Sequence, residues 1–126
     1  MNYLATSINE SPVIVVTAAA AVTDVRGHAF KFDGNGNAAL CAEGDTPLGI
    51  GIMTMGDEGA VAEGEEFTLQ HKDIGYVCAG GAIVKGANLS VDANGAFVTA
   101  SSGAGVAIAL QAAAAAGQYI PAILRF

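Results

Sequence analysis

The sequence predicts an all-β fold, and three observations support this prediction. Apolar runs are short and are separated by Gly, Asn, Asp or Pro, which is typical of strands and turns. A segment from the middle of the chain recurs in shorter form near its end. Gly is also frequent, at 17 of 126 residues, while charged residues make up only 13%. The length and these small side chains indicate one compact β-rich domain.

The internal duplication rests on three matches that occur in the same order. Residues 30–36 match 89–95, residues 48–52 match 104–108, and residues 62–67 match 115–120. The second copy is shorter between the matches. The predicted repeat units therefore span about 20–73 and 82–126, within a single β-rich domain over 17–126.

Residues 1–16 are expected to form an extended N-terminal arm. Its first part is polar and ends at Pro12, a composition that suits a segment ordered only on a partner. The β-branched run that follows could add to the sheet edge of a partner, or it could be the first strand of the domain itself. The candidate contact residues of the arm are Tyr3, Leu4, Ile8, Val13, Ile14, Val15 and Val16.

In the first copy, the run Val13–Thr17 opens a series of predicted strands that continues at 28–32, 38–42, 48–54 and 66–72. Asp33-Gly34-Asn35-Gly36 joins two of them. This motif predicts a hairpin turn whose two central residues adopt positive φ.

A further strand is expected at 75–79, between the copies, and the second copy is expected to form strands at 82–85, 89–91, 96–99, 105–110 and 119–126. Asp92-Ala93-Asn94-Gly95 predicts the second hairpin. The alanine run at 112–116 has helical propensity, but it corresponds to a glycine-containing loop of the first copy. We therefore expect a connecting loop there, with one helical turn at most.

The charge pattern argues against nucleic acid as a partner. The net charge is −7, and seven of the twelve acidic residues lie between Glu43 and Glu66. The five basic residues are scattered, whereas phosphate binding requires clustered Lys and Arg. We interpret the acidic segment as solvated loops.

The two cysteines and the apolar N-terminal segment indicate neither a metal site nor a membrane protein. Cys41 and Cys78 fit no CxxC or zinc spacing, so buried free thiols are expected, although one disulfide is possible. Residues 13–22 lack a preceding positive charge and are too short to cross a bilayer, which disfavours a secretory signal and a membrane span.

No catalytic or cofactor-binding motif is present, so we expect neither catalysis nor a cofactor. His28 and His71 are the only imidazoles, and no nucleophile elbow or HExxH pair accompanies them. Residues 33–37 resemble the start of a calcium loop. Its sixth and twelfth positions, however, are Ala38 and Gly44 instead of Gly and an acid, so no metal site is expected.

Several segments together resemble the head decoration proteins of tailed phages, also called capsid cement proteins. They are Val16-Thr17-Ala18-Ala19, the 48–52 strand with its acidic loop, 66–70 running into 75–77, 105–107, and the 112–117 loop before the last strand. The similarity covers nearly the whole chain from about Val16 onward.

The resemblance implies a small β-tulip or β-clip fold on the outer surface of the virion. Such proteins clamp neighbouring major capsid subunits of the expanded head as homotrimers at three-fold and quasi-three-fold positions, and the arm would pair with the shell. Two alternatives remain open: a tail or fibre domain, and a small trimeric β-clip binding module or enzyme.

Overall fold

The computed structural model describes residues 11–54, 59–103 and 105–126, and within these ranges the chain is all β, without a helix. This confirms the predicted fold class and is consistent with a β-clip-like fold. The strands are β1 (Val13–Thr17), β2 (Ala29–Phe32), β3 (Ala38–Leu40), β4 (Gly49–Thr54), β5 (Glu66–Gln70), β6 (Ile74–Cys78), β7 (Asn88–Val91), β8 (Phe97–Thr99), β9 (Ala107–Ala109) and β10 (Tyr119–Leu124).

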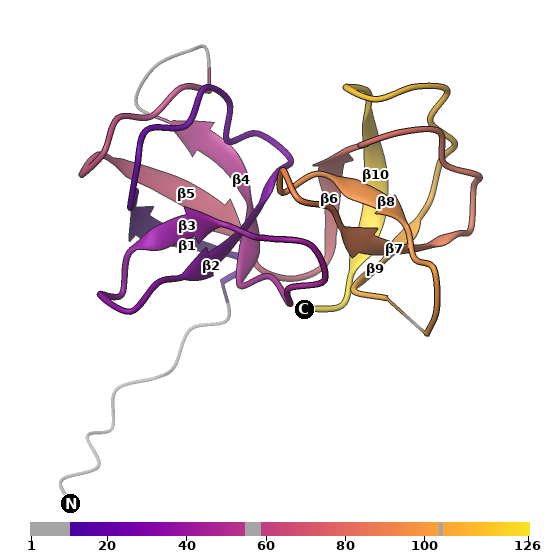
Figure 1. Cartoon of the computed structure of the whole chain (residues 1–126), viewed down its shortest axis with the longest axis horizontal. Helices are drawn as coiled ribbons and strands as arrows, with labels where there is room; N and C mark the ends of the chain where they lie inside the picture. Colours follow the sequence, from indigo (N-terminus) through magenta and orange to yellow (C-terminus); the bar gives the residue numbers. More distant parts are fainter. Residues whose placement is uncertain (1–10, 55–58, 104) are drawn as a thin grey trace, which may run out of the picture.

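The strands form two antiparallel five-stranded sheets that lie side by side (Figure 1). The first sheet has the order β1-β5-β4-β2-β3 and the second β6-β10-β9-β7-β8. The two orders are identical once five is added to each strand number of the first. We call β1 to β5 the N-terminal unit and β6 to β10 the C-terminal unit. The duplication therefore also relates β1 to β6, two strands that lie outside the three sequence matches.

The duplication extends to individual backbone hydrogen bonds. The amide of Leu48 donates to Phe30, and that of Val106 donates to Leu89, each over 2.7 Å. Isolated bridges pair Val22 with Val61 and, in the second unit, Ile83 with Ala113. Leu48 thus corresponds to Val106, so the predicted match of 48–52 with 104–108 is wrong by two residues and the equivalent segment is 106–110. With this register, the two units are copies of one backbone design.

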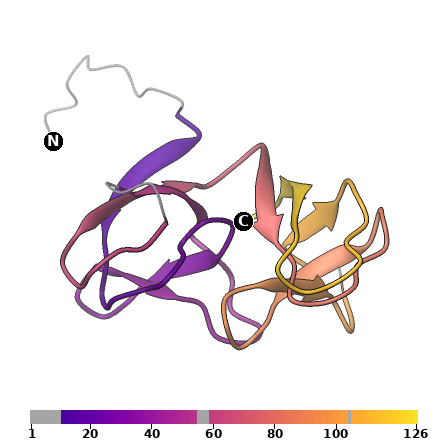
Figure 2. The same cartoon turned by 90° about the horizontal axis from the view of Figure 1, so that it is seen from above.

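The two edge strands of each sheet approach one another at one end. In the N-terminal unit a parallel bridge joins Ala18, just after β1, to Ala38 of β3. The corresponding bridge joins Ala79 to Phe97. Each unit is thus a small, partly closed barrel whose edge strands are bridged at one end, and Figures 1 and 2 show the curled sheets from two directions. We call the space between the edge strands beyond this bridge the gap of the unit.

The hairpin turns differ from the prediction in one respect. Only their last glycines, Gly36 and Gly95, have positive φ, at 78° and 77°. The predicted positive φ of both central residues is wrong, because the loops are longer than two residues. The Asp33 carboxylate accepts the amides of Asn35 and Asn37, and Asp92 does the same in the second copy. These bonds, not central glycines, shape the turns.

Two further predicted segments, 82–85 and 112–116, can be compared with the structure. The expected strand at 82–85 is absent: only Ile83 forms a bridge, because a turn begins directly after it. The alanine run at 112–116 is a connecting loop without a helical turn, as expected from its position in the repeat. Most other predicted strands are confirmed with ends shorter by one to three residues.

The hydrophobic core has two parts, and they are unequally shared. One cluster lies wholly within the N-terminal unit, where the rings of Phe30 and Phe67 meet edge to face at 4.9 Å. The other fills the C-terminal unit and also includes Ala29, Cys41 and Ile50 of the N-terminal unit. The core of the C-terminal unit therefore continues into the contact between the two units.

Candidate assembly interface

The contact between the units is made where the segment Gly27–Ala29 enters the gap of the C-terminal unit. The amide of Cys78 at the end of β6 donates to the carbonyl of Gly27 (2.9 Å). On the other side, the amide of Ala29 donates to the carbonyl of Gly95, in the turn before β8 (2.7 Å). The segment therefore bridges the two edges of the gap with backbone hydrogen bonds.

In the N-terminal unit, none of the described residues fills the corresponding gap. By the repeat, Thr17, Phe32 and Gly36 correspond to Cys78, Val91 and Gly95. Val91 is 1% exposed and its carbonyl accepts the amide of Gly44, whereas Phe32 is 52% exposed. A side chain at Gly95 would contact Leu40, but nothing lies within 4 Å of the corresponding position at Gly36. The N-terminal gap thus exposes apolar surface that its counterpart buries.

The outer edge of β1 belongs to this open region. The amide of His71 donates to the carbonyl of Pro12, and Ala18 donates to Glu65, so even-numbered residues between them direct their backbone groups toward β5. The backbone groups of Val13, Val15 and Thr17 point away from β5. Of these, Val13 hydrogen-bonds to the hydroxyl of Ser11.

The residues predicted for the arm fall into two groups. Val13, Ile14, Val15 and Val16 lie in β1, paired with β5 of the same sheet, so this run is the first strand of the protein's own sheet. Val16 is buried, while Val15 is 65% exposed. Tyr3, Leu4 and Ile8 lie outside the described residues.

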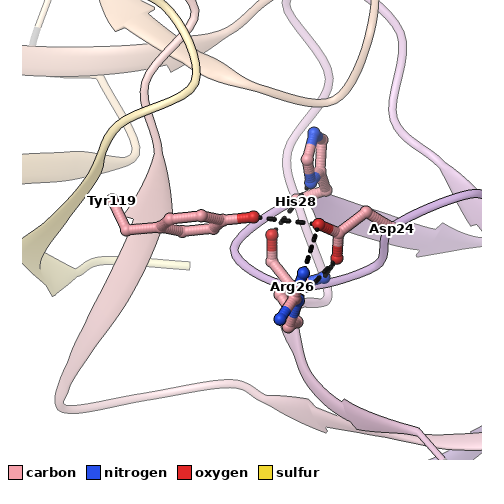
Figure 3. Close-up of polar contacts among 4 residues, drawn as sticks. All are labelled: Asp24, Arg26, His28 and Tyr119. Atoms are coloured by element: carbon pink, nitrogen blue, oxygen red, sulfur yellow. Dashed lines mark hydrogen bonds and ion pairs between the residues drawn. The ribbon is translucent and has the colours of Figure 1, made fainter. Parts of the chain in front are cut away.

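A polar cluster holds the two units together beside the filled gap (Figure 3). The guanidinium of Arg26 donates to both carboxylate oxygens of Asp24 at 2.9 Å. The hydroxyl of Tyr119, at the start of β10, donates to the same carboxylate at 3.0 Å. His28 completes the cluster, with Nδ1 2.9 Å from the carbonyl oxygen of Arg26. Asp24 therefore connects both units through side chains.

The hydrogen bonds of this cluster shift its pKa values. The hydrogen bond from Arg26 lowers the pKa of Asp24 to about 2, and the pKa of Arg26 is correspondingly raised. Burial, followed by the hydrogen bond to Asp24, raises the pKa of Tyr119. Asp24 is thus a carboxylate and Tyr119 a neutral phenol near neutral pH.

A groove of about 380 Å³ lies between the units next to this cluster. Its polar side chains are Arg26, Gln70, Tyr76 and Tyr119, and Tyr76 is 65% exposed. Arg26 and Tyr119 bind Asp24, and the amide of Gln70 donates to the carbonyls of Lys72 and Ile74. Arg26, Gln70 and Tyr119 therefore make structural contacts within the chain.

Both cysteines are buried free thiols, as predicted. Burial raises the pKa of Cys41 to about 11 and also raises that of Cys78. A thiol with a raised pKa is a poor nucleophile and metal ligand. The cysteines therefore act as small core residues.

The remaining candidate residues make structural contacts. His71 lies just after β5, with Nε2 2.6 Å from the carbonyl oxygen of Ser11. Asp33, first residue of the calcium-loop resemblance, accepts turn amides. Among the described residues, no group of three or more His, Cys, Asp or Glu could hold a metal ion. The described part of the chain also contains no helix able to span a membrane.

The sequence analysis did not single out Asp24, Arg26, Gly27 or Tyr119. A signal was present: the segment from Val22 to Gly27 is two residues longer than its counterpart from Ile83 to Gly86. This insertion carries Asp24. It became recognisable only once the bridges aligned the two copies.

The fold has a counterpart among solved structures. The chain is similar to the N base of the head fiber protein gp8.5 of bacteriophage phi29, with a TM-score of 0.68 and 19% sequence identity. The similarity covers 89% of this chain and 92% of that one. No family model matches the sequence, and no curated protein matches it. At this identity the similarity establishes the shared fold.

Proposed function

We propose that this chain is a structural protein of the exterior of a tailed-phage head, where it binds the major capsid protein and stabilises the expanded shell. The observation that carries the proposal is the similarity to the base of a phage head fiber over nearly the full length of both chains. The resemblance to head decoration proteins, derived independently from the sequence, supports the same assignment.

The composition of the chain suits this role. Few charges and several exposed large apolar side chains favour contact with other proteins. The net charge of −7 would keep decorated particles from associating with one another. The imidazoles bind backbone carbonyls and the thiols are buried, which supports a non-enzymatic role.

Attachment through the N-terminal arm is the proposed capsid contact. Tyr3, Leu4 and Ile8 would lie on the shell, and the open backbone of Val13 and Val15 could accept a strand of the major capsid protein. Each net hydrogen bond would contribute roughly 0.5–1.5 kcal/mol. Because a shell offers many equivalent sites, weak individual contacts would add up to substantial stabilisation.

A head-fibre base is the second candidate function. It is favoured by the solved structure to which this chain is similar, because that structure is the base of a fiber. A base of this kind would share the outer surface of the head with a cement protein but would carry a fibre and occur in fewer copies.

Deletion of residues 1–12 tests the attachment. The body should remain folded, because β1 and its pairing with β5 are intact. The truncated protein should bind purified expanded heads at least roughly tenfold more weakly, as measured by co-sedimentation. A scrambled arm of the same composition is the matched control. Binding as tight as that of the full chain would exclude the arm as the anchor.

A further inference from the structure

We propose that copies of this chain associate head to tail, with the open gap of the N-terminal unit receiving residues 86–88 from the C-terminal unit of a second copy. The inference deepens the proposed function and rests on it: if the decorating protein is a homotrimer, as the resemblance implies, three chains would close a ring of six similar units. The contact between the units of one chain serves as the template for the contact between chains.

The backbone geometry supplies the first argument. Gly86 corresponds to Gly27: both have positive φ, and their amides donate to the equivalent residues Ala109 and Gly51. Gly27 is seated against Cys78 and Tyr119, whereas nothing lies within 4 Å of the corresponding position at Gly86. Gly86 and Asn88 are exposed, so the inserting segment of the C-terminal unit is free to enter a gap.

The open gap has the groups needed to receive this segment. The outward amide of Thr17 would donate to the carbonyl of Gly86, as Cys78 donates to Gly27. The amide of Asn88 would donate to the carbonyl of Gly36, as Ala29 donates to Gly95. Phe32 would become covered, as Val91 is. Exposed apolar groups on an end unit are unusual in repeat folds, whose terminal units normally carry polar outer faces.

Charge complementarity supplies the second argument. Lys85 directly precedes Gly86, as Arg26 precedes Gly27. Glu66 opens β5, as Tyr119 opens β10, and Tyr119 lies in the polar cluster with Arg26. Glu66 of one copy would therefore lie beside Lys85 of the next. Both side chains are exposed in the isolated chain.

This contact leaves the capsid site accessible. Within the chain, the side-chain amide of Gln70 donates a hydrogen bond to the carbonyl of Ile74, at the end of β6 that follows the short connection between the units. Separate copies have no such connection. Tyr76, in the middle of the β6 edge, remains 65% exposed although the gap is filled. Its counterpart Val15 would likewise stay open for a strand of the shell.

The association is heterologous, because the two contacting faces differ. Such contacts form closed rings when the rotation between subunits closes and filaments when it does not. A single-residue test can address each face separately, which a symmetric two-fold contact would not allow.

A charge exchange on the full-length protein tests the proposal. Glu66→Lys and Lys85→Glu should each weaken association by roughly threefold to tenfold per contact, and the double variant should restore it. Sedimentation velocity and native mass spectrometry would measure the assembly. Glu63→Lys, an exposed acidic residue before β5, is the matched control and should not change association.

Phe32→Ser is the second variant and should also dissociate the ring, with Ile74→Ser, in the groove inside the chain, as its control. A chain that stays monomeric at every concentration, or an assembly indifferent to both charge reversals, overturns the proposal. Head binding separates the two inferences: an exchange-sensitive trimer that never binds heads would leave the ring standing and refute the capsid function.

Discussion

The N-terminal and C-terminal units share a strand order but differ in what lies in the gap between their edge strands. In the C-terminal unit the gap holds Gly27–Ala29, Val91 is buried, and the hydrophobic core continues into the neighbouring unit. In the N-terminal unit the gap is open, Phe32 is exposed, and the core is self-contained. The same backbone design therefore has its gap filled in the C-terminal unit, whereas no described residue fills it in the N-terminal unit.

The comparison teaches that, in a duplicated fold, the contact between the two units of one chain can serve as a template for a contact between chains. The within-chain contact displays the geometry, the hydrogen bonds and the side chains by which units of this type meet. Positions that are buried in the C-terminal unit and exposed in the N-terminal unit are those at which the proposed contact with a second copy would form. Four predictions test how far the equivalence of the two units extends.

The largest expected effect is at Gly51, whose counterpart in the C-terminal unit is Ala109. A Cβ at Gly51 would collide with the backbone carbonyl of Val25. Gly51→Ala should destabilise the protein by about 3 kcal/mol or more, whereas Ala109→Gly should cost only about 1 kcal/mol. Chemical denaturation measures both. Equal losses of stability in the two variants would contradict the close approach of the Val25 carbonyl to Gly51.

The turn glycines should show the next largest effect. Both Gly36→Val and Gly95→Val force a β-branched residue into positive φ, at a cost of about 1–3 kcal/mol. At Gly95 the new side chain would also meet Leu40 at 2.8 Å, so its loss should be the greater. Thermal unfolding would rank the two. Unchanged melting temperatures would mean that these positions tolerate the substitution and that positive φ does not limit them.

The turn aspartates should behave alike in the two units. Oδ1 of Asp33 accepts two amides at 2.8 and 2.9 Å, and Oδ1 of Asp92 accepts two at 2.8 and 3.0 Å. Each change to Ala should cost about 1–2 kcal/mol, and each change to Asn, which retains an acceptor, should cost less. A loss confined to one unit, seen by denaturation, would break the equivalence of the turns.

The smallest effect should be the acid sensitivity of the cluster around Asp24, a residue of the insertion without a counterpart in the C-terminal unit. The pKa of Asp24 falls from 3.8 to about 2 on folding, so the ionised form stabilises the protein above pH 4. This contribution, about 1 kcal/mol after solvent screening, is lost as the pH falls toward 2.

Asp24→Asn should therefore be less stable at neutral pH and should lose less of its stability than the parent between pH 4 and pH 2. Urea titrations across this range measure the difference, with Asp92→Asn as a carboxylate control. Parallel pH profiles of stability for Asp24→Asn and the parent would mean that the ionised Asp24 does not stabilise the contact between the units.

Much of the fold could be predicted from local signals. The duplicated turn aspartates, the β-branched runs and the glycine spacing correctly indicated an all-β chain with repeated hairpins. The equivalence of β1 and β6 could not be recognised, because Val13–Thr17 and Ile74–Cys78 occupy the same place in their sheets but have few residue types in common. Their correspondence is a property of pairing with β5 and β10, which depends on contacts distant in sequence.

The candidate interface was less predictable for the same reason. Phe32 and Val91 are both apolar and occupy the same position of the repeat. The exposure of one and the burial of the other follow from what covers each unit, which the sequence does not show. Val13–Val16 was correctly recognised as a strand, with both a partner's sheet and the protein's own sheet left open as its place. Its pairing with β5 assigns it to the protein's own sheet.

The most direct test of the proposed function is the number of copies of this chain in purified virions, counted by quantitative mass spectrometry against the major capsid protein. A number comparable to that of the capsid subunits is the result we expect for a protein that decorates the shell. A handful of copies would favour the base of a fibre. Absence from the virion would contradict the assignment to the phage head.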